Sequence, residues 1–178
     1  MGDYTSAADM FRQCAENCVM SNLKRFNSKM FLLKSILCKY ATSTDAHKEK
    51  YTRMIQTSTE FQEIDYLWST CKERLFVTNI AGACLNGDLD AFADHIYYWY
   101  CVRPPDILCI KVLQKMKDDI ISELARKKES EEQERVEEEE RKRKQELKER
   151  MNDELFELES VQEHSNAQES NSTRKSLT

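Results

Sequence analysis

Apolar residues in the first part of the chain recur at intervals of three and four, the spacing of one face of an α-helix. Residues 4–18 predict a first helix, and residues 23–41 predict a second whose lysines lie mainly outside the apolar stripe. The side chains expected to face inward are Tyr4, Ala7, Ala8, Phe11, Cys14, Ala15 and Cys18 in the first helix, and Phe26, Met30, Leu33, Ile36, Leu37 and Tyr40 in the second.

Weaker patterns follow before the next clear stripe. The Ser-Thr-Asp sequence at residues 43–45 is typical of a helix N-cap and predicts a third helix from near Ala46. Residues 57–66 carry little periodicity, so we expect either a loop or a loose helix start there. A fourth helix is expected over roughly residues 67–86.

The stretch from residue 76 to residue 120 predicts three helices joined by two tight corners. Gly87 follows an apolar face and ends the first of them, because glycine takes a left-handed conformation without a Cβ clash. Asp88 is placed to cap the next helix. The two prolines at 104–105 stop that helix, and Asp106 is placed to cap the third.

These patterns together predict an all-α fold. The chain has only three glycines and two prolines, and no segment sustains the alternation of a strand. Consecutive amphipathic helices with short joints indicate antiparallel hairpins stacked as a tetratricopeptide-like α-solenoid over residues 1–121. The small alanines between large residues in positions 4–11 fit that packing.

The composition changes after residue 121. Between residues 125 and 145 the only apolar side chain besides Ala125 is Val136, so there is no heptad seam. Four glutamates at 137–140 precede four basic residues at 141–144 by four positions each, which favours a solvated single helix over a weak coiled coil. We therefore expect a charged helix over residues 122–160. By composition, residues 161–178 are expected to be a disordered tail.

Charge and hydropathy exclude several classes of protein. A net charge of −5 and a pI near 5.4 argue against nucleic-acid binding, which needs a basic footprint. No window approaches the roughly 18 apolar residues of a membrane span, and the first residues do not form a signal peptide. These features predict a cytoplasmic protein with at most peripheral membrane association. Its seven cysteines are expected to be reduced and mostly buried.

No catalytic or metal-binding arrangement is visible in the sequence. His47, His95 and His164 are scattered, and no glycine-rich phosphate loop is present. Cys14 and Cys18 lie one helical turn apart, but no second ligand pair accompanies them. We therefore expect no enzymatic activity, no cofactor and no metal. The aromatic run at residues 97–100 is expected to pack in the core rather than form a ligand cage.

Two fragments, in this order and spacing, resemble the C-terminal half of the soluble NSF attachment protein family (α/β-SNAP type). They are YTSAADMF followed by LKRFNSKMFLLKSILCKY, and LNGDLDAFADHIYYWYCVRPPDILCIKVLQKMKDDI. The resemblance implies a non-enzymatic adaptor whose basic face lies along the assembled SNARE four-helix bundle. It also implies partners in the NSF ATPase or another SNAP. By resemblance, Lys29 and Lys72 are the positions that face the SNAREs.

The chain departs from the family where the resemblance implies contact with NSF. The acidic positions used toward NSF fall on Gly82, Leu85 and Asn86, and the place of a penultimate leucine falls on Lys127. These departures predict a divergent or interfering paralogue in vesicle fusion and SNARE recycling. An alternative class stays open, a cytoskeletal or ciliary scaffold that uses the charged helix to bridge partners.

Overall fold

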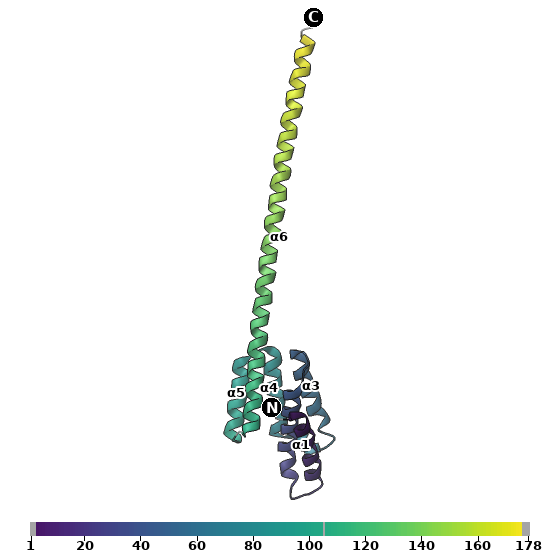
Figure 1. Ribbon diagram of the computed structural model, residues 1–178, viewed down its shortest axis with the longest axis vertical. Helices are drawn as coiled ribbons and strands as arrows, with labels where there is room; N and C mark the ends of the chain where they lie inside the picture. The colour runs from purple at the N-terminus through teal and green to yellow at the C-terminus, as the bar shows by residue number, and fades with distance from the viewer. Residues whose placement is uncertain (1–2, 105, 176–178) are drawn as a thin grey trace. The chain divides into compact units, whose positions relative to one another are not determined.

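The computed structural model describes residues 3–104 and 106–175, and the side chains among them up to Met151. All of its elements are helical, so within these residues the all-α prediction is confirmed. They comprise α-helices and two short 3₁₀ helices, η1 and η2. In chain order they are α1 (Tyr4–Val19), η1 (Arg25–Asn27), α2 (Ser28–Thr42), α3 (His47–Glu60), η2 (Tyr66–Thr70), α4 (Lys72–Asn86), α5 (Leu89–Val102) and α6 (Ile107–Lys175) (Figure 1).

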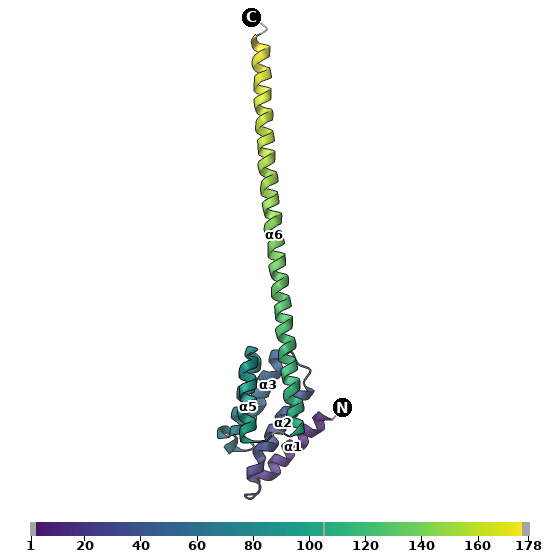
Figure 2. The same cartoon turned by 90° about the vertical axis from the view of Figure 1, so that its left-hand side faces the viewer.

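The chain divides into two compact units, Met1–Arg126 and Lys127–Thr178, which we call unit 1 and unit 2. In unit 1 successive helices run in opposite directions, so α1 with α2, α3 with α4, and α5 with the start of α6 form antiparallel hairpins (Figures 1 and 2). This is the stacked-hairpin arrangement that the helical spacing predicted.

Helix α2 lies at the centre of unit 1. Its apolar residues Leu32, Leu33, Ile36 and Leu37 are each at most 1% exposed. The small residues of α1 let the two helices approach closely, and the Ser35 hydroxyl donates a 2.8 Å hydrogen bond to the Ala8 carbonyl oxygen. A helix buried on several sides needs apolar residues beyond a single stripe, and α2 has them.

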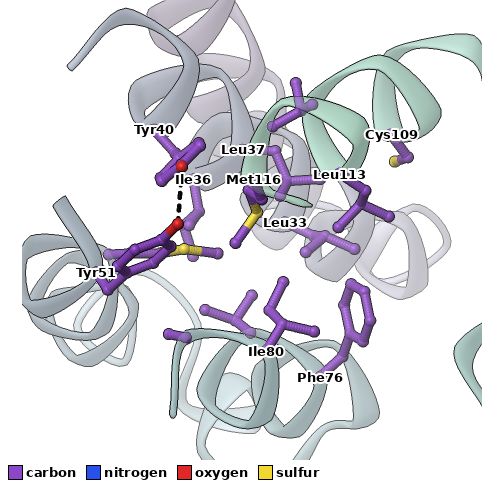
Figure 3. Packing of buried hydrophobic residues seen from close by; sticks show 14 of the residues in the cluster. Leu33, Ile36, Leu37, Tyr40, Tyr51, Phe76, Ile80, Cys109, Leu113 and Met116 are labelled. Atoms are coloured by element: carbon purple, nitrogen blue, oxygen red, sulfur yellow. Dashed lines mark hydrogen bonds between the residues drawn. The ribbon is translucent and has the colours of Figure 1, made fainter. Parts of the chain in front are cut away.

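The core continues from α2 into α4 and the first turns of α6 (Figure 3). Ile80 of α4 and Met116 of α6 are fully buried, and Leu113 is nearly so. Burying one such side chain stabilises a fold by about 1.5–3 kcal/mol relative to leaving it in water. The beginning of α6 therefore belongs to the core of unit 1.

Both predicted corners are confirmed. Gly87 ends α4 with φ of 70°, the left-handed conformation expected of it. The Asp88 carboxylate then accepts a 2.9 Å hydrogen bond from the Ala91 N–H and caps α5. At the second corner the Asp106 carboxylate accepts a 2.9 Å hydrogen bond from the Cys109 N–H in the first turn of α6.

The second predicted helix begins later than the spacing indicated, and the inward position predicted for Phe26 is wrong. The helix starts at Ser28, and Phe26 lies in η1 with 73% of its surface exposed. The physical reason is a tertiary contact. The Ser28 hydroxyl lies 2.7 Å from both the Arg25 carbonyl oxygen and Asp65 Oδ2, so the chain before Ser28 is held in a 3₁₀ turn.

The fourth predicted helix is likewise shorter than expected at its start. Residues 66–70 form η2, whose first turn is capped by the Asp65 carboxylate accepting from the Leu67 N–H at 3.1 Å. Cys71 is extended, and its Sγ accepts from the Arg74 N–H, so α4 begins at Lys72. The weakly patterned segment before it is a tight joint, not a continuous helix.

The thiols divide into two groups. Cys14 and Cys101 are exposed, so the inward position predicted for Cys14 is wrong. The other five are buried, and burial raises the pKa of Cys38 to about 11 and those of Cys84 and Cys109 to about 12. At neutral pH these three thiols are protonated, and they pack as small apolar side chains.

In unit 2 the described side chains after Lys127 are exposed, including Val136 at 49%. Three of the predicted i,i+4 ion pairs form: Glu137–Arg141 at 3.6 Å, Glu138–Lys142 at 2.8 Å and Glu140–Lys144 at 3.8 Å. Each contributes little to stability, because the charges stay in water.

The backbone of α6 is helical up to Lys175, and the tail predicted over residues 161–178 lies beyond the described side chains. The physical reason that it can be helical is the lack of any glycine or proline after Pro105. The last residues of the predicted tail, 176–178, lie outside the described residues.

Candidate interaction surface

One end of unit 1 gathers three connections of the chain, and we call it the loop end (Figures 1 and 2). It holds the loop between α1 and α2 (residues 20–27), the joint between α3 and α4 (residues 61–71) and the corner between α5 and α6 (residues 103–106). Because the helices alternate in direction, every second connection comes to the same end. The corner at Gly87 lies at the opposite end.

Arg25 and Asp65 hold the loop against the α3–α4 joint. The Arg25 guanidinium donates to Asp65 Oδ1 at 3.3 Å and lies 4.6 Å from the centre of the Tyr66 ring. Burial alone would raise the pKa of Asp65. The hydrogen bonds from Ser28, the Leu67 N–H and Arg25 outweigh it and hold this pKa below its ordinary value.

Arg103 joins the α5–α6 corner to the same end. Its guanidinium lies 3.7 Å from the Glu73 carboxylate and 6.0 Å from the centre of the Phe26 ring. Glu73 is 8% exposed, so its negative charge is paired and largely withdrawn from the surface. The corner and the α1–α2 loop therefore form one continuous surface through Arg103 and Phe26.

The structure places the two predicted SNARE-facing lysines at this end. Lys29 is half-buried in the first turn of α2, and Lys72 is exposed as the first residue of α4. Burial raises the pKa of the Cys71 thiol, which precedes Lys72 in the chain. The Arg74 N–H and the charge of Lys29 oppose that rise, and Glu73 adds to it. Lys29 therefore acts electrostatically on the cysteine that precedes Lys72.

A groove between α4 and α5 begins at Lys72. Its floor is the buried pair Phe76 and Trp99, whose rings stack with centroids 4.6 Å apart and planes 15° from parallel. Leu75, Tyr98 and Val102 are exposed, so most of the groove's wall is apolar. The lining residues are Lys72, Leu75, Phe76, Asn79, His95, Tyr98, Trp99 and Val102.

The aromatic run at residues 97–100 therefore has two roles. Trp99 packs in the core as predicted and Tyr100 is partly buried against it. Tyr97 and Tyr98 are each 66% exposed, and Tyr98 lines the groove. The helical spacing placed Trp99 correctly, but it gave no sign that Tyr98 borders a groove.

The positions at which the family resemblance implied contact with NSF lie elsewhere. Gly82, Leu85 and Asn86 occupy the last five residues of α4, at the end opposite Lys72. Gly82 and Leu85 are half-buried, whereas Asn86 is exposed. Lys127 lies within α6, at the first residue of unit 2. None of these four side chains is acidic.

The described residues contain no group of three or more His, Cys, Asp or Glu side chains placed to hold a metal ion. Over the same part of the chain, no helix has the length and apolar character to cross a membrane.

The family follows from a comparison with sequence profiles. The profile of the soluble NSF attachment proteins (SNAP) matches residues 1–121. The chain belongs to this family. Searches of curated proteins and of solved structures found no match. The match covers unit 1 up to the first turns of α6, so the loop end and the α4–α5 groove both lie in the SNAP-family part of the chain.

Sequence reasoning missed the exposed apolar residues of the α1–α2 loop. Met20, Leu23 and Phe26 are 88%, 96% and 73% exposed. Helical spacing assigned Leu23 and Phe26 to a helix, and it offered no role for Met20. The available signal was electrostatic, because residues 17–44 contain five lysines or arginines and no aspartate or glutamate. Such a run at a helix connection marks a surface that repels basic partners and attracts acidic ones.

Proposed function

We propose that this SNAP-family chain is a non-enzymatic adaptor that binds the assembled SNARE helix bundle in vesicle fusion and SNARE recycling. The observation that carries the proposal is the family match over residues 1–121, within which Lys29 and Lys72 lie in the first turns of α2 and α4, at the loop end. We place this activity in the cytoplasm, with Lys29 and Lys72 toward the bundle.

Electrostatics supports the proposed orientation. Lys72 is exposed beside an apolar groove, and the nearest buried carboxylate, Glu73, is paired with Arg103. A lysine beside an apolar hollow fits a helix that carries acidic residues next to an apolar stripe. Long-range attraction to an acidic helix bundle accelerates encounter, and the groove fixes the orientation after contact.

We further propose that this chain corresponds to the C-terminal half of a SNAP and stimulates the NSF ATPase weakly. Gly82, Leu85, Asn86 and Lys127 occupy the positions that the resemblance assigned to NSF contact, and none carries a negative charge. A chain that holds SNAREs without engaging NSF would act as an interfering paralogue. It would then occupy the bundle alongside, or in place of, a complete SNAP.

Binding to an assembled SNARE complex tests the adaptor proposal. We expect the purified full chain to be retained in a pull-down at low salt, and less so as ionic strength rises. Lys29→Glu and Lys72→Glu should each weaken binding by about fivefold or more, because a like charge then faces the acidic bundle. Lys48→Glu is the matched control, since Lys48 is exposed near the start of α3, at the opposite end of unit 1.

The same purified chain can be used to distinguish an active adaptor from an interfering paralogue. Added to a SNAP-driven, NSF-dependent disassembly reaction, an interfering chain slows disassembly, and Lys72→Glu relieves the inhibition. A chain that stimulates NSF would instead support disassembly when the SNAP is left out. If the chain binds neither SNAREs, NSF nor a SNAP, the adaptor proposal is wrong.

The ion pairs of unit 2 favour a second candidate function. Exposed i,i+4 pairs over residues 137–144 make that segment a water-stable helix with no apolar seam of its own. Such a helix can bridge partners in a cytoskeletal or ciliary scaffold. Co-sedimentation of the full chain with filaments, together with no binding to SNAREs, would favour this class over the adaptor.

A further inference from the structure

Three large apolar side chains of the loop between α1 and α2 are exposed to solvent. The exposed fractions of Met20, Leu23 and Phe26 are 88%, 96% and 73%. Single exposed apolar residues are ordinary on protein surfaces and need no explanation. Three within one short connection form a local apolar surface, and such surfaces mark sites of interaction.

The charge of this loop is basic. Residues 20–27 carry Lys24 and Arg25 and no acidic residue, and the three lysines that follow lie in α2. Arg25 is paired with Asp65 and Lys34 with Asp106. Lys24 lies between Leu23 and Phe26 in sequence, is exposed, and forms no ion pair within the part of the chain that the structure describes. Its charge is available to a partner.

Several backbone groups of the loop are already hydrogen-bonded within the chain. The N–H groups of Lys24 and Arg25 donate to the Ser21 carbonyl oxygen at 3.0 and 2.9 Å, and the Asn27 N–H donates to the Lys24 carbonyl oxygen at 2.9 Å. Peptide groups that bond internally lose little when water is removed. The Arg25–Asp65 contact fixes the loop further, so binding requires little additional ordering.

The residues around the loop also expose apolar and aromatic side chains. Tyr66, next to Arg25, is 67% exposed, and Val102, next to Arg103, is 58% exposed. The buried carboxylates of this end, Asp65 and Glu73, are both paired with arginines. The exposed carboxylates there are Glu60 and Glu63, at the end of α3 and in the joint that follows it, and Glu16 in the last turn of α1, which pairs with Arg12. The α1–α2 loop itself has none.

We propose that the α1–α2 loop is a contact site for an anionic lipid surface. Met20 and Leu23 enter the interfacial layer of the bilayer, while Lys24 lies among the acidic headgroups. A lipid surface fits better than a protein groove because the three side chains project from a loop and are mostly exposed. A fluid lipid interface can accept these side chains without a pocket of complementary shape. This contact requires no SNARE and is independent of the proposed function.

Vesicle flotation of the full chain tests the proposal without any SNARE present. We expect binding to vesicles of 70% phosphatidylcholine and 30% phosphatidylserine, and little binding to phosphatidylcholine alone. Lys24→Glu should weaken binding to the anionic vesicles by about fivefold or more, the loss expected for one basic residue at such a surface. The double variant Met20→Ser and Leu23→Ser should weaken it by about tenfold or more, because two side chains no longer leave water.

The controls use residues of the same kind outside the loop. Met10→Ser replaces a side chain in α1 that is 65% exposed, and Lys48→Glu reverses an exposed charge in α3; both should leave vesicle binding unchanged. All five substituted positions are exposed, so misfolding is not expected to explain a loss. Leu23→Trp adds a direct readout. Its fluorescence should be quenched by vesicles of brominated lipid, whereas the buried Trp68 and Trp99 of the unaltered chain should not be quenched.

Three results would overturn the proposal. The first is no binding to anionic vesicles. The second is loss with Lys24→Glu but not with the double serine variant, which would mean adsorption by charge alone. The third is unchanged vesicle binding by the double variant together with lost SNARE binding in solution, which would make the loop a protein-docking site. A chain that binds vesicles but no SNARE would retain this inference and reject the proposed adaptor function.

Discussion

The Tyr40 hydroxyl donates a 2.6 Å hydrogen bond to Oδ2 of Asp119 and thereby joins the central helix α2 to α6. The same hydroxyl lies 3.0 Å from that of Tyr51, and Lys50 approaches Asp119 Oδ2 at 3.3 Å. Burial raises the pKa of Tyr40, and the hydrogen bond to Asp119 raises it further, so the tyrosine is a neutral donor at physiological pH. Helices α2, α3 and α6 meet in this polar cluster.

Tyr40→Phe should lower the free energy of unfolding of unit 1 by about 1–2 kcal/mol, because Asp119 and Tyr51 each lose a partner in a partly buried site. Urea unfolding followed by tryptophan fluorescence measures it, since Trp68 and Trp99 both lie in the core of unit 1. Tyr97→Phe removes a hydroxyl from a side chain that is 66% exposed and should change stability by less than about 0.5 kcal/mol. Equal effects of the two variants would contradict the argument.

Alanine substitutions at Gly82, within α4, and at Gly87, at its end, should change the stability of unit 1 in opposite directions. Gly87 has φ of 70°, and a Cβ built on it would lie 3.1 Å from Leu124 Cδ2. Gly87→Ala should therefore destabilise unit 1 by about 1–2 kcal/mol. Gly82 lies inside the helix with nothing within 4 Å of an added Cβ, so Gly82→Ala should stabilise it by about 0.5–1 kcal/mol. The same fluorescence assay compares them, and a shared sign would show that backbone conformation is not what distinguishes them.

The parts of the fold that could be predicted from sequence are those fixed by neighbouring residues. Gly87 with Asp88, and Asp106 after the prolines, act within one helical turn, so their chemistry is visible in a short stretch. The exposed position of Phe26 was not predictable in this way. It depends on Ser28 contacting Asp65, and a separation of 37 residues cannot be read from helical spacing.

Less of the candidate site than of the fold could be predicted from the sequence. Lys29 and Lys72 came from the family resemblance, and spacing alone treats both as ordinary solvated lysines. That both lie at the loop end follows from the alternating directions of the helices, which bring the starts of α2 and α4 to the same end. The groove beside Lys72 requires Leu75 and Tyr98 to face the same hollow from different helices, which only the packing of α4 on α5 determines.

Asp65 predicts how the stability of unit 1 depends on pH. Its carboxylate is 1% exposed, and hydrogen bonds from Ser28, the Leu67 N–H and Arg25 outweigh the effect of burial and hold its pKa below the ordinary 3.8. The unfolded chain therefore binds this proton at a higher pH than the folded chain does. The resulting stabilisation is fully present above the ordinary pKa and is lost as the pH falls through the lower, folded pKa.

We expect the free energy of unfolding to decrease as the pH is lowered from 5 to 3, and Asp65→Asn to remove part of that dependence. At pH 7 the variant should be less stable than the unaltered chain by about 1–3 kcal/mol, because Arg25 and Ser28 lose a charged acceptor. The difference should narrow at pH 3, where the carboxylate of the unaltered chain approaches its own protonation. Urea unfolding at pH 7, 5, 4 and 3 measures both trends, with Asp9→Asn, on an exposed side chain of α1, as the control. A difference that stays constant from pH 7 to pH 3 would mean that Asp65 stabilises the joint through its shape and not through its charge.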